Sequence, residues 1–560
     1  MSLKEKNLEC IRLGFPELYE RLQSGTFALD ATQVAFEETV TRPALFVQTE
    51  GEEVVRMNSI YNPDHEAAIW IQGQQGLQEK NLFLFGLGNG SFGHALLNGK
   101  GMESKVLIYE PSANVFMMAL ECCDLREFFS IPGVRVIVEG INDDMASGVM
   151  EEMLTLDNYE SRQFFVSPQC EVLFPDIRKK WVKIYMDGVG VLMSNRNTVR
   201  RFIHISPYNQ LLNLKYLKRG YYISDIAAVW QTEVPVALVG AGPSLEENIE
   251  TLRERRNQMF LFAVDSALPY LLSKDIIPEA YICIEADKPM DFFQDERAFE
   301  IPMFCKVDTT YHLLEKHNAP KIFGYDEPFV MALYEKYHIP LPAYRYGGNG
   351  ATSLFAICKE LGVENVILVG QDMAYTNGHG SHAGGRDEGY DEENKFRIPG
   401  NNGDMVMSRQ DWYRFVKWYE NAIPVMNYNH VINTAENGAL VKGTECMTLN
   451  QALDRYGKSH KSVHKILTQV SFPGVFGKLK DLEKLYYEWE EELVQIDRIC
   501  KRNPKDEKRK KYDIYFLVKL YEEVNEKDSF DISQKDGIKK LNEYLKQCIR
   551  EVAKHGLGGN

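Results

Sequence analysis

Hydrophobic residues along the chain alternate between short continuous runs and longer stretches with helical spacing. Such runs lie in "NLFLFGLGNGSFGHALLNG", "KVLIYEPS" and "VRVIVEG" between residues 81 and 140, and in "VPVALVGAGPSL", "MFLFAVDSALPYLL", "AYICIEADKP" and "NVILVGQDMAY" between residues 234 and 375. Short apolar runs of this kind are typical of strands in a parallel sheet. The helix-length stretches between them supply the crossovers that parallel strands need. The pattern therefore predicts an α/β fold with two Rossmann-like parallel-sheet domains.

The final hundred residues have a different pattern, with apolar residues at helical spacing among many charges. The segments "LKDLEKLYYEWEEELVQIDRIC" and "GIKKLNEYLKQCIREVAK" are the clearest examples. This spacing predicts amphipathic helices. We therefore predict a Rossmann-like N-terminal domain at residues 1–205, a central nucleotide-binding α/β domain at 206–455, and a C-terminal α-helical domain at 456–560.

Charge and cysteine content narrow the function classes. The chain has 560 residues and a formal net charge of −16. This negative charge argues against general nucleic-acid binding and against binding to an anionic membrane surface. The ten cysteines form no CxxC pair and no zinc-site spacing, so we expect reduced thiols and a cytoplasmic protein. The sequence has neither a signal-peptide core nor an 18-residue uncharged apolar run, so we expect no membrane span.

A glycine-rich turn follows the first predicted strand of the N-terminal domain. The segment "NLFLFGLGNGSFGHALLNG" and the following "KVLIYEPS" have the strand, turn, helix and strand order of a dinucleotide-binding unit. Gly86, Gly88, Gly90 and Gly93 would allow a phosphate or a backbone segment to approach closely, and Glu110 ends the second strand. The sequence leaves open whether this turn binds a ligand or only serves tight backbone geometry.

Polar and glycine-rich groups follow four predicted strands of the central domain. Because ligands bind at the carboxyl ends of parallel strands, we expect these groups to form one site. The glycines of "GAGPSL" and "GGNGATSLF" would admit a phosphate to a helix start, where Ser244, Thr352 and Ser353 offer hydroxyls. The predicted binding residues are Gly240, Gly242, Pro243, Ser244, Asp265, Ser266, Glu285, Asp287, Gly350, Thr352, Ser353, Gly370, Gln371 and Tyr375.

Acidic residues and histidines at these strand ends suggest more specific roles. Asp265 and Ser266 would contact a ribose or a base edge, or form an ordinary turn. Glu285 and Asp287 would bind a divalent cation between phosphates, or serve as loop acceptors. Histidine titrates near neutral pH and acts as a general base or acid. His379 and His382 form an HxxH pair on the loop after "NVILVGQDMAY". This pair lacks a third ligand, so we expect no metal site.

The order of these motifs resembles that of a known enzyme family. The series "GAGPSL", "VDSAL", "EADKP", "GGNGATSLF", "GQDMAYTNGHGSHA" and "VINTAENGALVKG" resembles the motility-associated-factor (Maf) flagellin glycosyltransferases. The central region is also similar to bacterial sialyltransferases. The resemblance implies cytoplasmic transfer of a pseudaminic- or legionaminic-type nonulosonic sugar from a CMP donor to Ser or Thr of flagellin, with flagellin as partner and no further cofactor.

The resemblance does not identify the general base. The sialyltransferases have Asn where this chain has Ser266, and "FRIPGNNGDMVMSRQDWYRF" contains no histidine where their catalytic histidine would lie. We therefore predict His382, His379 and Asp372, in that order, as catalytic candidates.

Two other functions remain open at the level of sequence. The central region also resembles the 6-hydroxymethylpterin diphosphokinases, which implies ATP-dependent pyrophosphoryl transfer with Mg²⁺ held by Glu285, Asp287 and Asp372. A non-catalytic flagellin-binding role is the third possibility. Dependence on Mg²⁺ and ATP would distinguish pyrophosphoryl transfer from sugar transfer.

Overall fold

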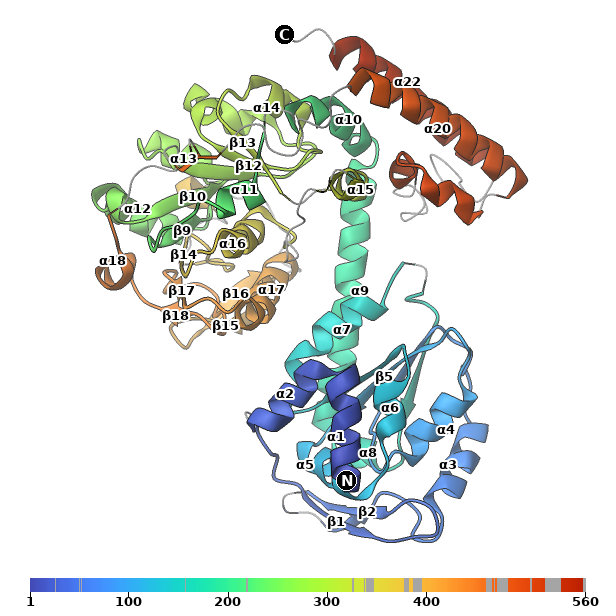
Figure 1. The fold of residues 1–560 in the computed structure, drawn as a ribbon. Coiled ribbons are helices and arrows are strands. Elements are labelled where there is room, and N and C mark those ends of the chain that lie inside the picture. The colour runs from blue at the N-terminus through green and yellow to red at the C-terminus, as the bar shows by residue number, and fades with distance from the viewer. Residues whose placement is uncertain are drawn as a thin grey trace. The chain divides into compact units, whose positions relative to one another are not determined.

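The fold is described from a computed structural model in which the chain forms two compact units, Met1–Thr198 and Val199–Asn560 (Figure 1). The described residues are 1–25, 27–49, 51, 53–156, 158–217, 220–324, 327–336, 338, 347–376, 382–385, 395–459, 466–467, 469–470, 482–503, 506–518 and 535–556.

The first unit contains a four-stranded parallel sheet of Rossmann type. Its strand order is β6-β5-β4-β7, so the chain adds two strands on one side of β4 and then crosses to the other side. The strands are β4 (Asn81–Phe85), β5 (Lys105–Glu110), β6 (Val134–Val138) and β7 (Arg162–Val166). The helices are α1 (Leu3–Gly14), α2 (Pro16–Ser24), α3 (Pro63–Gln72), α4 (Ser91–Gly99), α5 (Ala113–Cys122), α6 (Arg126–Ser130), α7 (Ala146–Met153), α8 (Cys170–Leu173) and, as far as Thr198, α9 (Pro175–Phe202).

Both faces of this sheet are buried, which explains the continuous apolar run of β4. Leu82 and Leu84 belong to one hydrophobic core, and Phe83 and Phe85 belong to the core on the opposite face. This alternation follows from the two-residue period of a strand. A separate antiparallel sheet is formed by β1 (Gln33–Glu37), β2 (Ala44–Gln48) and β3 (Val55–Arg56).

The second unit is built around a nine-stranded sheet in which every neighbouring pair is parallel. Its order is β18-β17-β14-β9-β10-β11-β12-β13-β8. The two Rossmann-like parallel sheets predicted from the sequence are therefore confirmed. The strands are β8 (Tyr221–Tyr222), β9 (Val236–Val239), β10 (Phe260–Val264), β11 (Ala280–Cys283), β12 (Met303–Cys305), β13 (Lys321–Phe323), β14 (Asn365–Val369), β17 (His430–Asn433) and β18 (Glu445–Cys446).

Helices and one antiparallel hairpin complete the second unit (Figure 1). The hairpin pairs β15 (Lys395–Pro399) with β16 (Met405–Arg409). The helices are α10 (Ser206–Leu217), α11 (Ile223–Ala227), α12 (Ser244–Glu254), α13 (Leu268–Ser273), α14 (Tyr311–Lys316), α15 (Pro328–Lys336), α16 (Gly350–Glu360), α17 (Gln410–Met426), α18 (Leu449–Tyr456), α20 (Leu482–Arg502) and α22 (Lys535–Gly556), with short 3₁₀ turns that include η3 (Met290–Phe293) and η5 (Ala383–Gly385).

The C-terminal helices share a hydrophobic core with the sheet of the second unit. Leu493 of α20 and Leu545 of α22 are buried in the same cluster as Leu211 of α10. The helical nature of the C-terminal segment is thus as predicted, whereas its separation into a domain at 456–560 stays a prediction. Among the described helices, none is long and apolar enough to cross a membrane.

Candidate functional site

The candidate site lies at the carboxyl edge of the nine-stranded sheet. Strand β9 pairs with β10 on one side and with β14 on the other, so the direction in which strands are added reverses at β9. Such a switch point is where open α/β sheets bind ligands. The predicted motifs that follow β9, β10, β11 and β14 all leave the sheet at this edge because the strands are parallel.

The glycine turns after β9 and β14 pack directly against each other. The Gly240 N–H donates to Val369 O at 2.8 Å, and the Gly242 N–H donates to Gly370 O at 2.7 Å. A Cβ on Gly240 would lie 2.6 Å from Gly370 O, and Gly370 itself has a φ of 63°. Glycine is therefore required here for contact between the turns. These two amides donate to protein carbonyls, and contact with a phosphate stays a prediction.

Asp372 connects the second turn to the start of α12. Its carboxylate accepts hydrogen bonds from the Ser244 N–H at 3.1 Å and from the Ser244 hydroxyl at 2.8 Å. The side chain is only 2% exposed, and burial raises its pKa to about 6, although the hydrogen bonds from Ser244 lower it. A carboxylate at a helix N-terminus is also favoured by the helix dipole. Asp372 thus caps α12 across the two turns.

Gln371 and Tyr375, on either side of Asp372, contact the protein itself. The Gln371 amide donates to Leu238 O at 3.0 Å, and its carbonyl accepts from the Tyr419 hydroxyl at 2.6 Å. The Tyr375 ring lies 4.7 Å from the Trp412 ring, and the ammonium of Lys395 lies 4.3 Å from the Tyr375 ring centre. Gln371 is therefore held by groups of the protein itself, and Tyr375 belongs to an aromatic and cationic cluster with the β15–β16 hairpin and α17. Contact of either residue with a nucleotide stays a prediction.

His382 lies beside the first glycine turn. The next residue, Ala383, donates its N–H to Ala241 O at 2.7 Å, and the Gly384 N–H donates to Glu246 Oε1 at 2.6 Å. These bonds hold η5 against the first turn of α12, and His382 is half-buried there. His379 lies outside the described residues.

Lys288 is a buried cation that the sequence prediction missed. Its ammonium lies 3.0 Å from Asp265 Oδ2 and 3.8 Å from Glu285 Oε1. Burial by itself lowers the pKa of Lys288, but Asp265 and Glu285 raise it above the ordinary value on balance. The only signal in the sequence was the lysine of "EADKP", which falls among more conspicuous acids.

The acidic pair of "EADKP" does not lie on a strand. Strand β11 ends at Cys283, and Glu285 and Asp287 are exposed in the loop that follows. Ser266, after β10, is half-buried next to Asp265. Within the described part of the chain, no group of three or more His, Cys, Asp or Glu side chains is arranged to hold a metal ion.

The hydroxyls at the start of α16 are used to build the helix end. Asn349 and Thr352 form a reciprocal capping box, and the Ser353 hydroxyl donates to Gly347 O at 3.2 Å. Gly350 lies so close to the ends of β10 and β11 that a Cβ would be 3.1 Å from Ile282 Cγ2. The N-terminus of α16 therefore opens at the same sheet edge, with its first amides lacking carbonyl partners within the helix.

Side chains of the first unit occupy the space at its glycine turn. Glu110 accepts hydrogen bonds from the Leu87 and Gly88 amides at 2.8 Å each, and a Cβ on Gly90 would meet Leu125 at 2.9 Å. All residues from 81 to 93 are buried. Of the two hypotheses from the sequence, the structure therefore favours the one in which these glycines allow close packing of backbone and side chains.

We expect Glu110 to make the stability of the first unit depend on pH. Burial raises the pKa of its carboxyl from 4.5 to about 7, although three backbone amides lower it. The folded chain thus binds more protons than the unfolded chain between these values, so stability is greatest below pH 4.5 and falls, by up to about 3 kcal/mol, as pH rises through 7. Urea unfolding of the wild type and of Glu110→Gln across this range measures the effect. Parallel curves for the two proteins would contradict it.

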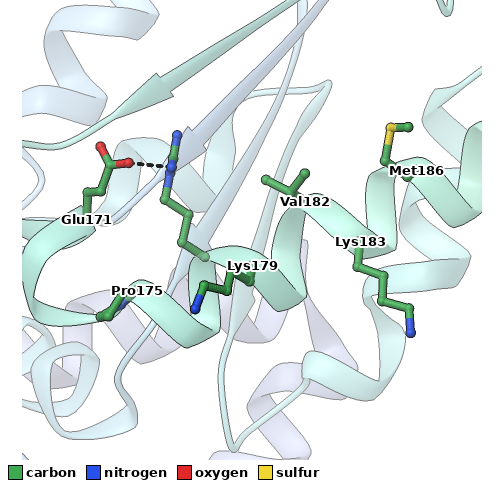
Figure 2. Close-up of a pocket in the computed structure, with 7 residues that line it drawn as sticks. Glu171, Pro175, Lys179, Val182, Lys183 and Met186 are labelled. Atoms are coloured by element: carbon green, nitrogen blue, oxygen red, sulfur yellow. Dashed lines mark hydrogen bonds and ion pairs between the residues drawn. The ribbon is translucent and has the colours of Figure 1, made fainter.

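The first unit also carries a surface cavity of about 530 Å³ on α8 and α9. Figure 2 shows Val182, Met186, Lys179 and Lys183 along α9, with Glu171 and Pro175 at one end. None of the predicted binding residues lines this cavity. It therefore does not belong to the candidate site.

Three comparisons with known proteins cover different shares of the chain. An uncharacterized protein of Treponema pallidum (strain Nichols) is 26% identical over 115 residues, which cover 20% of this chain and 53% of that protein. The match therefore spans about half of that relative's length. The structure of a MAf glycosyltransferase from Magnetospirillum magneticum AMB-1 aligns with 99% of this chain and 96% of its own, with 13% identity and a TM-score of 0.46. Over residues 208–378, the chain is similar to the family described as 6-hydroxymethylpterin diphosphokinase MptE-like.

Proposed function

We propose that the protein is a glycosyltransferase that moves a nonulosonic sugar of pseudaminic or legionaminic type from CMP to Ser or Thr hydroxyls of flagellin. The observation that carries the proposal is the convergence of four ordered motifs at one switch point. The motifs after β9, β10, β11 and β14 are those that resemble the Maf family, and all four leave the sheet at the edge where open α/β sheets in general bind ligands.

The start of α16 is the proposed binding site for the donor phosphate. Its first amides, those of Gly350 and Ala351, lack carbonyl partners within the helix, and the helix dipole favours an anion there. The glycine turn after β9 would form the opposite wall, with its shape fixed by the contacts to Gly370 and Asp372. These groups would stabilise the charge that develops on the CMP phosphate as it leaves.

His382 is the proposed general base. Its position beside the turn after β9, at the same sheet edge as the proposed phosphate site, supports this role. In a direct displacement, the acceptor hydroxyl gives its proton to the imidazole while its oxygen attacks the anomeric carbon, and CMP leaves from an oxocarbenium-like transition state. His379 is the second candidate. Asp372 ranks last because both carboxylate oxygens contact Ser244.

The family similarity over residues 208–378 keeps ATP-dependent pyrophosphoryl transfer as a second candidate. In that reaction Glu285 and Asp287, which are exposed at the same edge, would be the first ligands for Mg²⁺. Asp372 is a weaker ligand candidate because of its contacts to Ser244.

A reconstituted transfer reaction tests the proposal. The full-length protein is incubated with CMP-linked nonulosonate and unmodified flagellin, with Mg²⁺ in one sample and EDTA in another. We expect intact-mass spectrometry to detect added sugar on flagellin, with stoichiometric release of CMP in both samples. ATP- and Mg²⁺-dependent pyrophosphorylation of 6-hydroxymethylpterin without sugar transfer would support the second candidate. Flagellin binding without either reaction would leave only a non-catalytic role.

A further inference from the structure

The pair formed by Asp265 and Lys288 is buried at the carboxyl edge of the sheet. The Lys288 side chain is 6% exposed, and its ammonium also lies 4.1 Å from the centre of the Phe292 ring in η3. The Asp265 side chain is 13% exposed, so part of it still reaches the surface of the site. Removing either partner would leave an uncompensated charge in this setting.

The geometry of the pair leaves Asp265 able to accept further hydrogen bonds. Lys288 contacts Oδ2 at 3.0 Å, and a carboxylate has acceptor sites on both oxygens. Glu285, 3.8 Å from the same ammonium, adds a second carboxylate beside it. Lys288 therefore holds Asp265 in one orientation and leaves it acceptor capacity toward a ligand.

The local charge favours a hydroxyl-bearing group over a phosphate at this point. Among the described residues of this loop, the carboxylates of Asp265, Glu285 and Asp287 outnumber the ammonium of Lys288, and like charges repel a phosphate at close range. Vicinal hydroxyls, by contrast, donate well to a carboxylate. A ribose is the part of a nucleotide that presents two such hydroxyls, and an acidic residue at a strand end is a common partner for it.

We infer that Lys288 is a positioning residue that holds Asp265 to accept hydrogen bonds from the ribose hydroxyls of the bound nucleotide. The inference rests on the proposed function in that it needs a nucleotide at this edge of the sheet. It does not depend on whether the base is cytosine or adenine, since both nucleotides carry the same ribose.

Calorimetry with ribo- and deoxyribonucleotides tests this role. Full-length wild type is titrated with CMP and 2′-deoxy-CMP, and with ATP and 2′-deoxy-ATP. We expect the ribonucleotide to bind roughly tenfold to a hundredfold more tightly than its deoxy form, because a hydrogen bond to a charged acceptor is lost. Lys288→Met is expected to reduce this ratio to about twofold or less.

Two further variants separate positioning from a general effect on folding. Asp265→Asn is expected to reduce the affinity ratio in the same way. The double variant Lys288→Met/Asp265→Asn, which removes both members of the buried pair, is expected to reduce it no further. Lys321→Met is the matched control. Lys321 is the first residue of β13, so it lies at the opposite edge of the sheet from Lys288. Its ammonium lies 4.9 Å from the centre of the Tyr216 ring.

The outcomes distinguish this inference from the proposed function. The role of Lys288 would be overturned, even if CMP binds, by either of two results. The first is equal affinity of the wild type for the ribonucleotide and its deoxy form. The second is a ribo-to-deoxy affinity ratio as large as that of the wild type in Lys288→Met or in the double variant. Ribose discrimination seen only with ATP, and lost in Lys288→Met, would uphold Lys288 and contradict the CMP-based function. If neither nucleotide binds, both proposals fail.

Discussion

Alanine in place of Gly242 is expected to destabilise the second unit by about 3 kcal/mol and to abolish nucleotide binding. The added Cβ would lie 2.7 Å from Gly370 O and closer still to a carboxylate oxygen of Asp372. Both are held by neighbouring hydrogen bonds, so the turns after β9 and β14 have to separate. Urea unfolding of the full-length chain and calorimetry with CMP measure the two effects.

Gly348→Ala is the matched control for Gly242→Ala. Gly348 lies in the other glycine loop of the site, and a Cβ there has no described heavy atom within 4 Å. We expect its free energy of unfolding to stay within about 0.5 kcal/mol of the wild type. Equal stability of the Gly242→Ala and Gly348→Ala proteins would contradict the close contact between the two turns.

Replacing His382 by alanine is expected to slow sugar transfer by about 100- to 10,000-fold while leaving CMP affinity unchanged. The imidazole would remove the proton of the acceptor hydroxyl, whereas the donor nucleotide is held by other groups. Single-turnover transfer to flagellin measures the rate, and calorimetry measures CMP affinity.

His65→Ala serves as control, because His65 is exposed on α3 of the first unit. The double variant His379→Ala/His382→Ala includes the histidine that lies outside the described residues. Transfer by the double variant at the wild-type rate would show that neither histidine is the base. Asp372 would then be the remaining candidate for the base.

Three strands at the candidate site were predictable from the sequence because they are buried along nearly their whole length. The runs "VALV", "FLFAV" and "NVILV" contain almost no polar residue, and they correspond to β9, β10 and β14. The hairpin of β15 and β16 was not predicted, since the exposed and half-buried positions of these strands give no continuous apolar run. Short strands with mixed burial have no comparable signal.

The location of the candidate site was predictable, whereas the partners of its residues were not. The glycines of "GAGPSL" indicated a close approach, but the group that approaches is the neighbouring turn at Gly370. Asp372 and Ser244 are 128 residues apart, so their hydrogen bond has no local signal. Lys288 was missed for a similar reason, because a lysine becomes informative only when the structure buries it against Asp265.

The contact between the two turns has a consequence for synthesis on the ribosome. Strand β9 emerges well before β14, and Ser244 precedes Asp372 by 128 residues. At roughly 5–20 residues per second, about 6 to 26 s pass between the appearance of these two residues. During that interval the Gly242 amide lacks its folded-state acceptor, Gly370 O, and α12 lacks the Asp372 carboxylate that caps it. A nascent chain released before residue 372 would therefore carry the first glycine motif without the partner that shapes it.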